Sequence, residues 1–151
     1  QYIHQKYDVN CRCIRCREPK GQEIDWGFVE IKVNRYSASK GKEFFISVED
    51  TKNDLLVGFL RMRFPADSLR EEITSESAIV RELHVYGIAT SLGSEGTVQH
   101  KGWGKKLLLE AEKIAKENGK NKIVIISGIG VREYYKKLGY QLEGVYMVKQ
   151  I

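Results

Sequence analysis

The 151-residue sequence has no apolar run of roughly 18 residues, so it contains no segment that would cross a membrane as a helix. Its first residues are polar and do not form a secretory signal, and a chain that opens with Gln1 is expected to be a fragment or a processed form. Cysteine is scarce. The three cysteines are an odd number and all lie within residues 11–16, which does not suit a secreted disulfide framework. We therefore expect a reducing, cytoplasmic setting.

Two common phosphate-binding motifs are also absent. No Gly-x-x-x-x-Gly-Lys-Ser/Thr run is present, which argues against a P-loop, and no Gly-x-Gly-x-x-Gly follows a strand, which argues against a dinucleotide fold. The sequence instead contains Gln99-x-x-Gly102-x-Gly104, directly ahead of apolar residues at helical spacing. Free backbone N–H groups and the positive end of the helix dipole meet at such a helix start, and glycines let a large anion touch the backbone. This pattern predicts a cradle for phosphate or pyrophosphate, with an ordinary tight loop as the alternative.

The composition fits one folded domain with a small appendage. A hydrophobic fraction of 42% is enough to build a core. The 25 basic and 20 acidic residues give a net charge of +5, which is compatible with an anionic partner without requiring one. We divide the chain into a Cys-rich basic segment, residues 1–22, and a main domain, residues 23–151.

The main domain shows alternating strand and helix patterns. The expected strands are residues 28–33, 44–48, 55–64, 78–86, 123–126 and 140–148, the last of which is a strand or a hairpin, and the expected helices begin after residue 104 and near residue 131. A strand, a helix and a buried strand in succession imply a parallel crossover. The fold class is therefore expected to be α/β, with the glycine cradle at the carboxyl end of a strand, where open α/β sheets bind ligands.

Several longer runs extend this pattern. They are Arg81-Glu82-Leu83-His84-Val85-Tyr86-Gly87, then Gln99-His100-x-Gly102-x-Gly104, then Ile126-Ser127-Gly128-x-Gly130-x-Arg132-x-Tyr134-Tyr135-x-Lys137-Leu138-Gly139-Tyr140. Together with the preceding Cys11-x-Cys13-x-x-Cys16 segment, they resemble the GNAT acetyltransferases. Within that family they resemble the acetyltransferase domain of the Elongator catalytic subunit, a tRNA wobble-uridine modifying enzyme. The resemblance spans nearly the whole chain and implies a GNAT fold, a mixed central sheet with flanking helices, plus a small N-terminal zinc loop.

The resemblance implies an acetyl-CoA site at the fourth strand. In GNAT folds that strand splays from the fifth, and its backbone hydrogen-bonds the pantetheine arm as an added strand would. The residues expected at the cofactor are Glu82, Leu83, His84 and Val85 along the arm, and Gln99, Gly102, Trp103, Gly104 and Lys105 near the pyrophosphate. Plain strand packing is the alternative for residues 82–85.

Tyr134 and Tyr135 are the expected catalytic residues. Successive helical residues point about 100° apart, so the two tyrosines cannot be buried alike. By the resemblance Tyr135 lies near the cofactor sulfur, where a phenol would protonate the leaving thiolate or orient the thioester. The alternative is that both belong to the edge of the core. Glu82 is the carboxylate whose position best suits a general base.

The three cysteines have a spacing that can converge on one metal, in a segment with too little apolar material to order itself. Thiolates suit Zn²⁺, which takes four tetrahedral ligands in structural sites. We expect His84 as the fourth ligand, because the resemblance implies that the N-terminal segment packs against the strand at residues 78–86. His100 is a close second. Three free thiols are the alternative, and a catalytic cysteine is disfavoured because no paired base is evident. The neighbouring Arg12, Arg15 and Arg17 are expected to form a phosphate clamp for tRNA, or else merely to solvate the loop.

The function implied by the resemblance is to supply the acetyl group for modification of the tRNA wobble uridine at carbon 5. The expected partners are tRNA, acetyl-CoA and the rest of the same polypeptide, with a second copy of the chain or other Elongator subunits as further candidates. The family's radical S-adenosylmethionine domain, with its 4Fe-4S cluster, has no counterpart here and is expected in a missing N-terminal part. The competing hypotheses are a free-standing N-acetyltransferase for a protein lysine or small amine, and a non-catalytic RNA-binding module on a degenerate scaffold.

Overall fold

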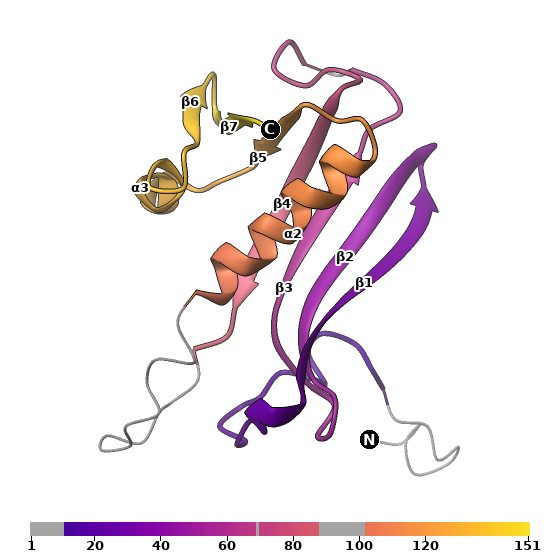
Figure 1. Cartoon of the computed structure of the whole chain (residues 1–151), viewed down its shortest axis with the longest axis vertical. Helices are drawn as coiled ribbons and strands as arrows, with labels where there is room; N and C mark the ends of the chain where they lie inside the picture. The colour runs from indigo at the N-terminus through magenta and orange to yellow at the C-terminus, as the bar shows by residue number, and fades with distance from the viewer. Residues whose placement is uncertain (1–10, 69, 88–101) are drawn as a thin grey trace.

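The computed structural model describes residues 11–68, 70–87 and 102–151. Figure 1 shows a twisted sheet crossed by one long helix. The elements in chain order are η1 (Trp26–Phe28), β1 (Val29–Ala38), β2 (Gly41–Asp50), β3 (Leu55–Phe64), β4 (Ser77–Val85), α2 (Trp103–Glu117), β5 (Lys122–Ile125), η3 (Ile129–Val131), α3 (Arg132–Lys136), β6 (Gln141–Glu143) and β7 (Tyr146–Gln150). The predicted order is confirmed, and the end of the chain is the hairpin β6–β7. The first two strands are longer than predicted, because polar residues that break the apolar alternation still pair along the whole of β1 and β2.

The described residues form a seven-stranded sheet in the order β1-β2-β3-β4-β5-β7-β6. Every neighbouring pair in it is antiparallel except β4 and β5, which are parallel. This is the predicted parallel crossover through α2. It divides the sheet into two antiparallel parts that meet at a single parallel pair.

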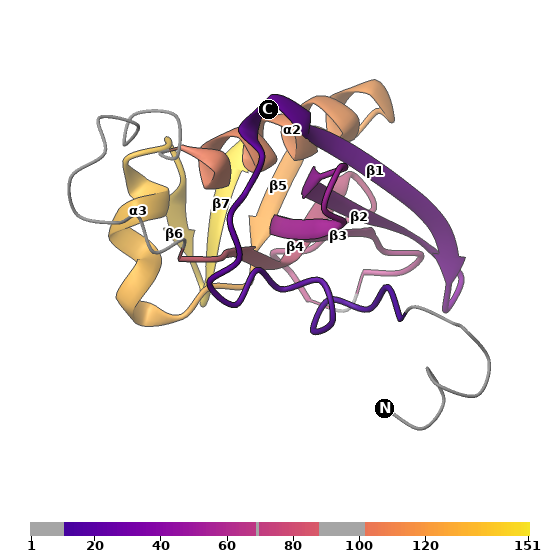
Figure 2. The same cartoon turned by 90° about the horizontal axis from the view of Figure 1, so that it is seen from below.

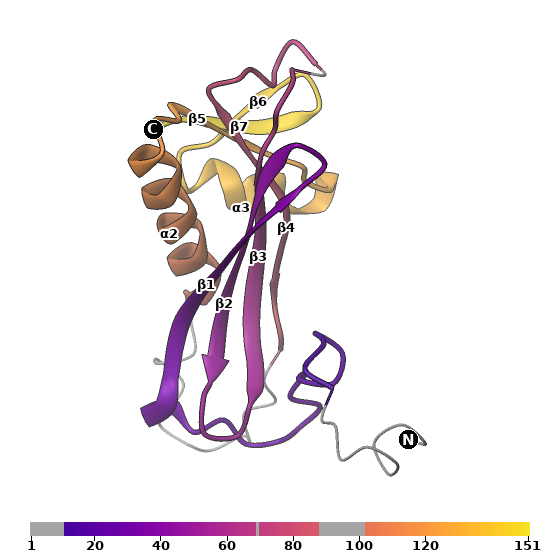
Figure 3. The same ribbon diagram turned by 90° about the vertical axis from the view of Figure 1, so that its right-hand side faces the viewer.

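Helix α2 covers one face of the sheet (Figures 2 and 3). Its apolar side packs with buried residues of β2, β3, β4 and β5 in one cluster. The helix residues buried there are Leu107, Leu108, Ala111, Ile114 and Ala115. These are the residues whose spacing predicted the helix, so the amphipathic pattern of α2 reports its burial against the sheet.

Residues 11–22 lie against the opposite face, near the end where β2 turns into β3 (Figures 2 and 3). The Leu56 N–H donates to Arg17 O at 2.7 Å, which fastens this segment to the start of β3. On this face β2 buries polar side chains, namely those of Glu43, Ser47 and Glu49. Buried polar groups require partners. Arginines from elsewhere in the chain pair with Glu43 and Glu49, and the Ser47 hydroxyl donates to Glu49.

Candidate functional site: an opening between two strands

The sheet opens between β4 and β5. Their parallel pairing ends at Val80 and Ile125, and the Ile126 N–H donates to Val80 O at 2.9 Å. Beyond that point β4 continues to Val85 along β3 without pairing to β5 (Figure 1). Residues 82–85 therefore present one backbone edge to the opening, where an extended molecule can add to the strand.

A β-bulge at Arg81 marks the place where β4 leaves β5. The register between β3 and β4 shifts by one residue there, which leaves Arg81 as the extra residue. Its Nη2 donates to Glu43 Oε2 at 2.7 Å, and the Glu43 side chain is only 3% exposed. Arg63 on β3 binds the same carboxylate. The bulge is thus tied to β2 by a buried carboxylate, which holds the bend of β4 in place.

Helix α2 begins at this opening. Its N-cap, Gly102, has a φ of 101°, a left-handed conformation that glycine adopts without strain, and no side chain among the described residues caps the helix. The first intrahelical bond runs from the Lys106 N–H to Gly102 O, so the N–H groups of Trp103, Gly104 and Lys105 have no partner within the helix. The first turn carries two lysines and no acid, the reverse of what the helix dipole favours. An anion bound here would compensate the dipole, the lysines and the free N–H groups together.

Gly104 leaves room for a tyrosine from α3. A Cβ at residue 104 would lie 2.7 Å from Tyr134 Oη and 3.8 Å from Val85 Cγ2. The Tyr134 hydroxyl therefore lies over the first turn of α2, next to the end of β4. Three elements that are far apart in the sequence, β4, α2 and α3, meet at this point.

The two adjacent tyrosines differ in burial. Tyr134 is 41% exposed, whereas Tyr135 is 6% exposed and belongs to the core. The Tyr135 ring contacts Tyr134 and Tyr140 edge-on, at centroid distances of 5.3 and 6.0 Å. Burial raises the pKa of both Tyr134 and Tyr135, so both stay protonated at neutral pH. The side chain of Tyr135 is thus in the core, and the hydroxyl that borders the start of α2 belongs to Tyr134.

The side chains of residues 82–85 alternate about the strand. Leu83 packs into the core beneath α2. Glu82 points to the other face, where its Oε2 lies 3.5 Å from Arg61 Nη1. The ring of His84 lies 5.8 Å from the ring of Phe59 and 4.6 Å from that of Tyr86. The side chains of Glu82, Leu83 and His84 contact other parts of the sheet and the core. The part of β4 that lines the opening is therefore its backbone edge.

Trp103 provides the side chain nearest to the helix start. Its ring stacks on that of Trp26 at 6.5 Å with an interplanar angle of 14°, and Lys106 Nζ lies 3.9 Å from its centroid. The indole Nε1 is buried and has no hydrogen-bond partner in the described structure. A buried donor without a partner calls for an explanation, and a ligand at the helix start is one.

The sulfur atoms of Cys11, Cys13 and Cys16 lie within 4.8 Å of one another. The pKa of Cys13 is lowered to about 7, because the backbone N–H of Cys16 and the two neighbouring thiols donate to its sulfur. The pKa of Cys16 is raised to about 11 by the proton it shares with Cys13 and Cys11. The predicted convergence of the three thiols is therefore present in the geometry. The thiols are free and exposed.

The predicted fourth ligand, His84, is not part of this cluster within the described residues. The reason is that its ring packs between Phe59 and Tyr86 on the sheet. The second choice, His100, and the predicted cofactor residue Gln99 lie outside the described residues.

Two of the three arginines expected to form a phosphate clamp are paired with acids of this chain. Arg12 Nη2 lies 2.8 Å from Asp54 Oδ1. Arg17 Nη2 lies 2.7 Å from Glu49 Oε2, and these two side chains are 10% and 4% exposed. Only Arg15 of the three is left without an ion pair in the described part of the chain. Arg12 and Arg17 thus fix the Cys-rich segment to the end of β2 and to the β2–β3 turn. The sequence did not indicate these ion pairs.

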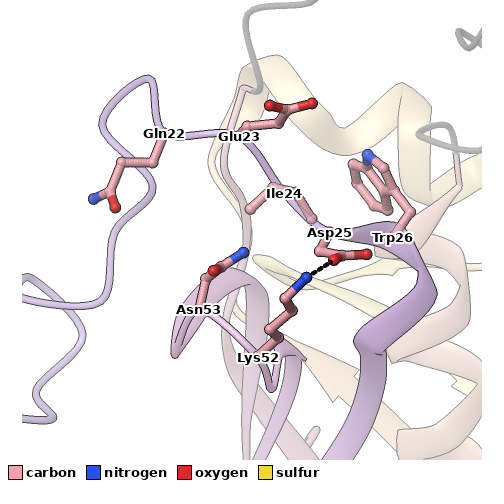
Figure 4. A pocket seen from close by; sticks show the side chains of 7 residues that line it. All are labelled: Gln22, Glu23, Ile24, Asp25, Trp26, Lys52 and Asn53. Atoms are coloured by element: carbon pink, nitrogen blue, oxygen red, sulfur yellow. Dashed lines mark hydrogen bonds and ion pairs between the residues drawn. The ribbon is translucent and has the colours of Figure 1, made fainter.

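A second hollow, of about 680 Å³, lies between the residues that lead into η1 and the β2–β3 turn (Figure 4). It is lined by Gln22, Glu23, Ile24, Asp25, Trp26, Lys52 and Asn53. Lys52 Nζ lies 2.8 Å from Asp25 Oδ2, so its cation is neutralised from within. The hollow borders the start of α2 through Trp26, and no residue that the sequence predicted for a site lines it.

Known proteins similar to this chain include acetyltransferases and Elongator proteins. The model for the "Acetyltransferase (GNAT) family" matches residues 11–140. The chain is 49% identical over 157 residues to the tRNA uridine(34) acetyltransferase of Methanocaldococcus jannaschii, covering 97% of this chain and 29% of that protein. It is 49% identical over 150 residues to Elongator complex protein 3 of Schizosaccharomyces pombe, covering 93% of this chain and 28% of that protein. The chain therefore spans less than a third of the length of these relatives.

A solved structure agrees with these sequence matches. The archaeal Methanocaldococcus infernus Elp3 with an N-terminus deletion (1–46) superposes with a TM-score of 0.88 at 46% identity, over 99% of this chain and 37% of that one. No helix among the described residues has the length and apolar character to span a membrane.

Proposed function

The chain belongs to the acetyltransferase (GNAT) family, and from this premise we propose that it holds acetyl-CoA in the β4–β5 opening. The fold implies acetyl-CoA binding, and the residues are our assignment. The pantetheine arm pairs with the free backbone edge of residues 82–85, and the pyrophosphate takes the N–H groups of Trp103, Gly104 and Lys105. One observation carries the proposal: the parallel pair opens at the same place where an uncapped helix begins with two lysines in its first turn. Gln99 completes the expected motif.

The hydroxyl that we assign to the reaction is that of Tyr134, with Tyr135 as its packing support. In acetyl transfer an acceptor attacks the thioester carbonyl, the carbon–sulfur bond breaks, and the sulfur leaves with the electron pair. Because burial raises the pKa of Tyr134, its phenol is less acidic than a thiol, whose ordinary pKa is about 8.5. Tyr134 therefore donates a hydrogen bond that orients the thioester and stabilises the departing thiolate, rather than giving up its proton completely.

We also propose that the chain is part of a longer protein, in which it supplies an acetyl group for the modification of a uridine in tRNA. The printed names of the relatives support this reading, as does the lack of an obvious general base for an amine among the described residues at the opening. Glu82, the carboxylate expected to suit that role, points to the far face and pairs with Arg61. The radical S-adenosylmethionine chemistry, the 4Fe-4S cluster and contacts with other Elongator subunits belong to this proposal for the whole protein. The cytoplasmic setting stays a prediction.

We further propose that Cys11, Cys13 and Cys16 hold a structural Zn²⁺, and that residues 1–22 form a segment of their own, of which residues 11–22 dock on the main domain. Three thiols that share protons within 4.8 Å suit this metal, because Zn²⁺ replaces those protons and binds thiolates. The fourth ligand is assigned to none of the described residues. The Cys-rich segment is ordered in this proposal by the metal on one side and by Arg12 and Arg17 on the other.

The test of acetyl-CoA binding is a calorimetric titration of the 151-residue chain. Gly104→Glu should abolish binding, because the new side chain meets Tyr134 and places a negative charge at the pyrophosphate. Lys113→Glu is the matched control, since it adds negative charge on the exposed side of the same helix, away from its start. Unchanged affinity in a folded Gly104→Glu chain would reject the assignment.

The metal proposal is tested by elemental analysis. We expect about one equivalent of zinc per chain, lost in Cys13→Ser and retained in Arg15→Ser, which alters the same loop without removing a thiolate. Protein purified without chelator that contains no zinc would contradict this proposal and leave the acetyl-CoA site untouched.

A further inference from the structure

A groove lies between α2 and α3, at the edge of the core. It has a volume of about 190 Å³. Its lining comes from one side of α2, from the end of α3 and from β7, and consists of Lys105, Leu108, Leu109, Glu112, Lys137, Leu138 and Lys149. The groove thus has apolar walls, three lysines and one acid, which leaves a net charge of +2.

One of the three lysines is already neutralised. Lys149 Nζ lies 2.9 and 3.1 Å from the two carboxylate oxygens of Glu112, and the Tyr140 hydroxyl donates to the same carboxylate at 2.8 Å. Lys105 and Lys137 form no ion pair or side-chain hydrogen bond with any residue that the structure describes. The positive charge of the groove therefore comes from these two ammonium groups.

The neighbouring Lys136 shows what a lysine of α3 does when an acid is in reach. Its Nζ lies 2.6 Å from Glu133 Oε1. The pKa of Glu133 is held down first by this hydrogen bond from Lys136, and the charge of Lys137 contributes least. Lys136 and Lys137, at the end of α3, thus differ. Lys136 forms an ion pair on the surface, whereas Lys137 lines the groove and has no ion pair among the described residues.

The groove starts at the anion-binding end of α2. Lys105 is the third residue of the helix, and at about 1.5 Å per residue the groove extends roughly 10 Å from Lys105 to Glu112. Leu109, which is half exposed, and the half-buried Leu138 give it an apolar wall. A ligand with a pyrophosphate at the helix start would reach this groove with the next part of the molecule, and the groove suits an anion carried on a less polar group.

We propose that the groove binds the 3′-phosphate of coenzyme A, with Lys105 and Lys137 as its cationic partners. This inference rests on the proposed acetyl-CoA site. In coenzyme A the 3′-phosphate sits on the ribose whose 5′ carbon carries the pyrophosphate, so it lies one sugar away from the start of α2. Two unpaired lysines and no free acid match a phosphate dianion. The consequence is a preference for coenzyme A over its 3′-dephospho form.

A phosphate of an RNA backbone shares this chemistry. The groove is continuous with the first turn of α2 through Lys105, and this continuity favours the nucleotide end of the cofactor. A groove for RNA would have no reason to begin at Lys105, whose backbone N–H we assign to the pyrophosphate. The two sources are separated by the experiment below.

The experiment is a calorimetric comparison of acetyl-CoA with acetyl-3′-dephospho-CoA. The 151-residue chain, Lys137→Gln and the control Lys136→Gln are titrated with both ligands, and circular dichroism verifies that each is folded. The parent should bind acetyl-CoA about tenfold more tightly than the dephospho form, a gain expected of charge-assisted contacts. Lys137→Gln should reduce this preference to about threefold, since Lys105 remains, and Lys136→Gln should retain it.

Three results would overturn the proposal in different ways. If Lys137→Gln keeps the parental preference for acetyl-CoA over the dephospho form, the groove does not bind the 3′-phosphate, and the proposal of acetyl-CoA binding is unaffected. Failure of the folded parent to bind either ligand rejects the proposed function, and the groove with it. If Lys137→Gln weakens tRNA binding in a parallel assay while the preference between the two cofactors is unchanged, the groove belongs to an RNA phosphate instead.

Discussion

The start of α2 and the Cys-rich segment lie on opposite sides of the sheet (Figure 3). Both carry a cluster of basic residues, and the two clusters differ in what neutralises them. At the start of α2, Lys105 contacts no acid among the residues that the structure describes, and the first turn contains none. In the Cys-rich segment, Arg12 reaches Asp54 at 2.8 Å and Arg17 reaches Glu49 at 2.7 Å. The start of α2, where the lysines lack such partners in the described part of the chain and lie beside free N–H groups, suits an anion. The arginines of the Cys-rich segment are paired with carboxylates and anchor that segment to the main domain.

The two clusters are also expected to affect the stability of the fold in opposite directions. The anchor stabilises the folded chain, because a buried carboxylate and guanidinium depend on each other. The helix start destabilises it slightly, because lysines face the positive end of the dipole. Substitutions in the two clusters should therefore have effects of opposite sign on folding, and only one cluster should affect cofactor binding.

The largest effect is expected from Glu49→Ala, which leaves Arg17 buried without its carboxylate. We expect the free energy of unfolding to fall by about 3–5 kcal/mol, as is usual when one partner of a buried ion pair is removed. Urea denaturation measures this change. Glu110→Ala is the control, because its partner Lys113 is exposed and 3.7 Å away, and its cost should stay within about 0.5 kcal/mol. Equal costs for the two variants would show that the anchor is no stronger than a surface pair.

The next effect is expected from Lys105→Glu. Placing an acid in the first turn of α2 should raise the free energy of unfolding by about 0.5 kcal/mol, because it now complements the helix dipole. The same change should weaken acetyl-CoA binding more than about tenfold, because a cation next to the phosphates of the cofactor is replaced by an anion. Denaturation and titration on the same preparation measure both quantities. Weaker binding accompanied by lower stability would mean that the variant damages the fold instead of the site.

The sequence predicted features that depend on local patterns. The apolar spacing of α2, the parallel crossover and the glycines at the helix start were all visible in short windows, and each is confirmed as an element of the fold. The difference in burial between Tyr134 and Tyr135 was also predicted from helical geometry. Which of the two lies in the core was not, because that depends on how α3 packs beside Tyr140.

Ion pairs were the main feature that the sequence did not reveal. Arg12 and Asp54 are 42 residues apart, and Arg81 and Glu43 are 38 apart. Their pairing requires knowing which strands and turns lie side by side. For the same reason the sequence suggested that the arginines near the cysteines face outward, and it gave no indication that Lys137 and Lys105 share a groove.

A smaller effect should appear on acidification, where the anchor should loosen before the β4–β5 junction does. The hydrogen bond from Arg12 holds the pKa of Asp54 below its usual value of 3.8. Burial alone would raise the pKa of Glu49, yet Arg17 holds it below its usual 4.5. Carboxylates with a lowered folded-state pKa contribute stability above their unfolded pKa and lose it as the pH falls through the folded value. The anchor should therefore weaken below about pH 4.

Amide hydrogen exchange distinguishes the two places. The Leu56 N–H bonds to Arg17 O in the anchor, and the Ile126 N–H bonds to Val80 O where β4 and β5 part. As the pH is lowered, Leu56 should lose protection first, after correction for the intrinsic pH dependence of exchange. Loss of protection at Ile126 first, or at both together, would contradict the role of the carboxylates in the anchor.

The smallest effect concerns the two tyrosines, which reproduce the same contrast on one short helix. Tyr134→Phe removes a hydroxyl that lies at the opening, and it should weaken acetyl-CoA binding about threefold, the size of one neutral hydrogen bond. Stability should not change measurably, because Tyr134 is 41% exposed. Tyr135→Phe should leave acetyl-CoA affinity unchanged, since its ring stays in the core and continues to support Tyr134. Titration of both variants with acetyl-CoA decides between them. If Tyr135→Phe weakens binding and Tyr134→Phe does not, the phenol at the cofactor is Tyr135, as the sequence first suggested, and α3 must rotate when the ligand binds.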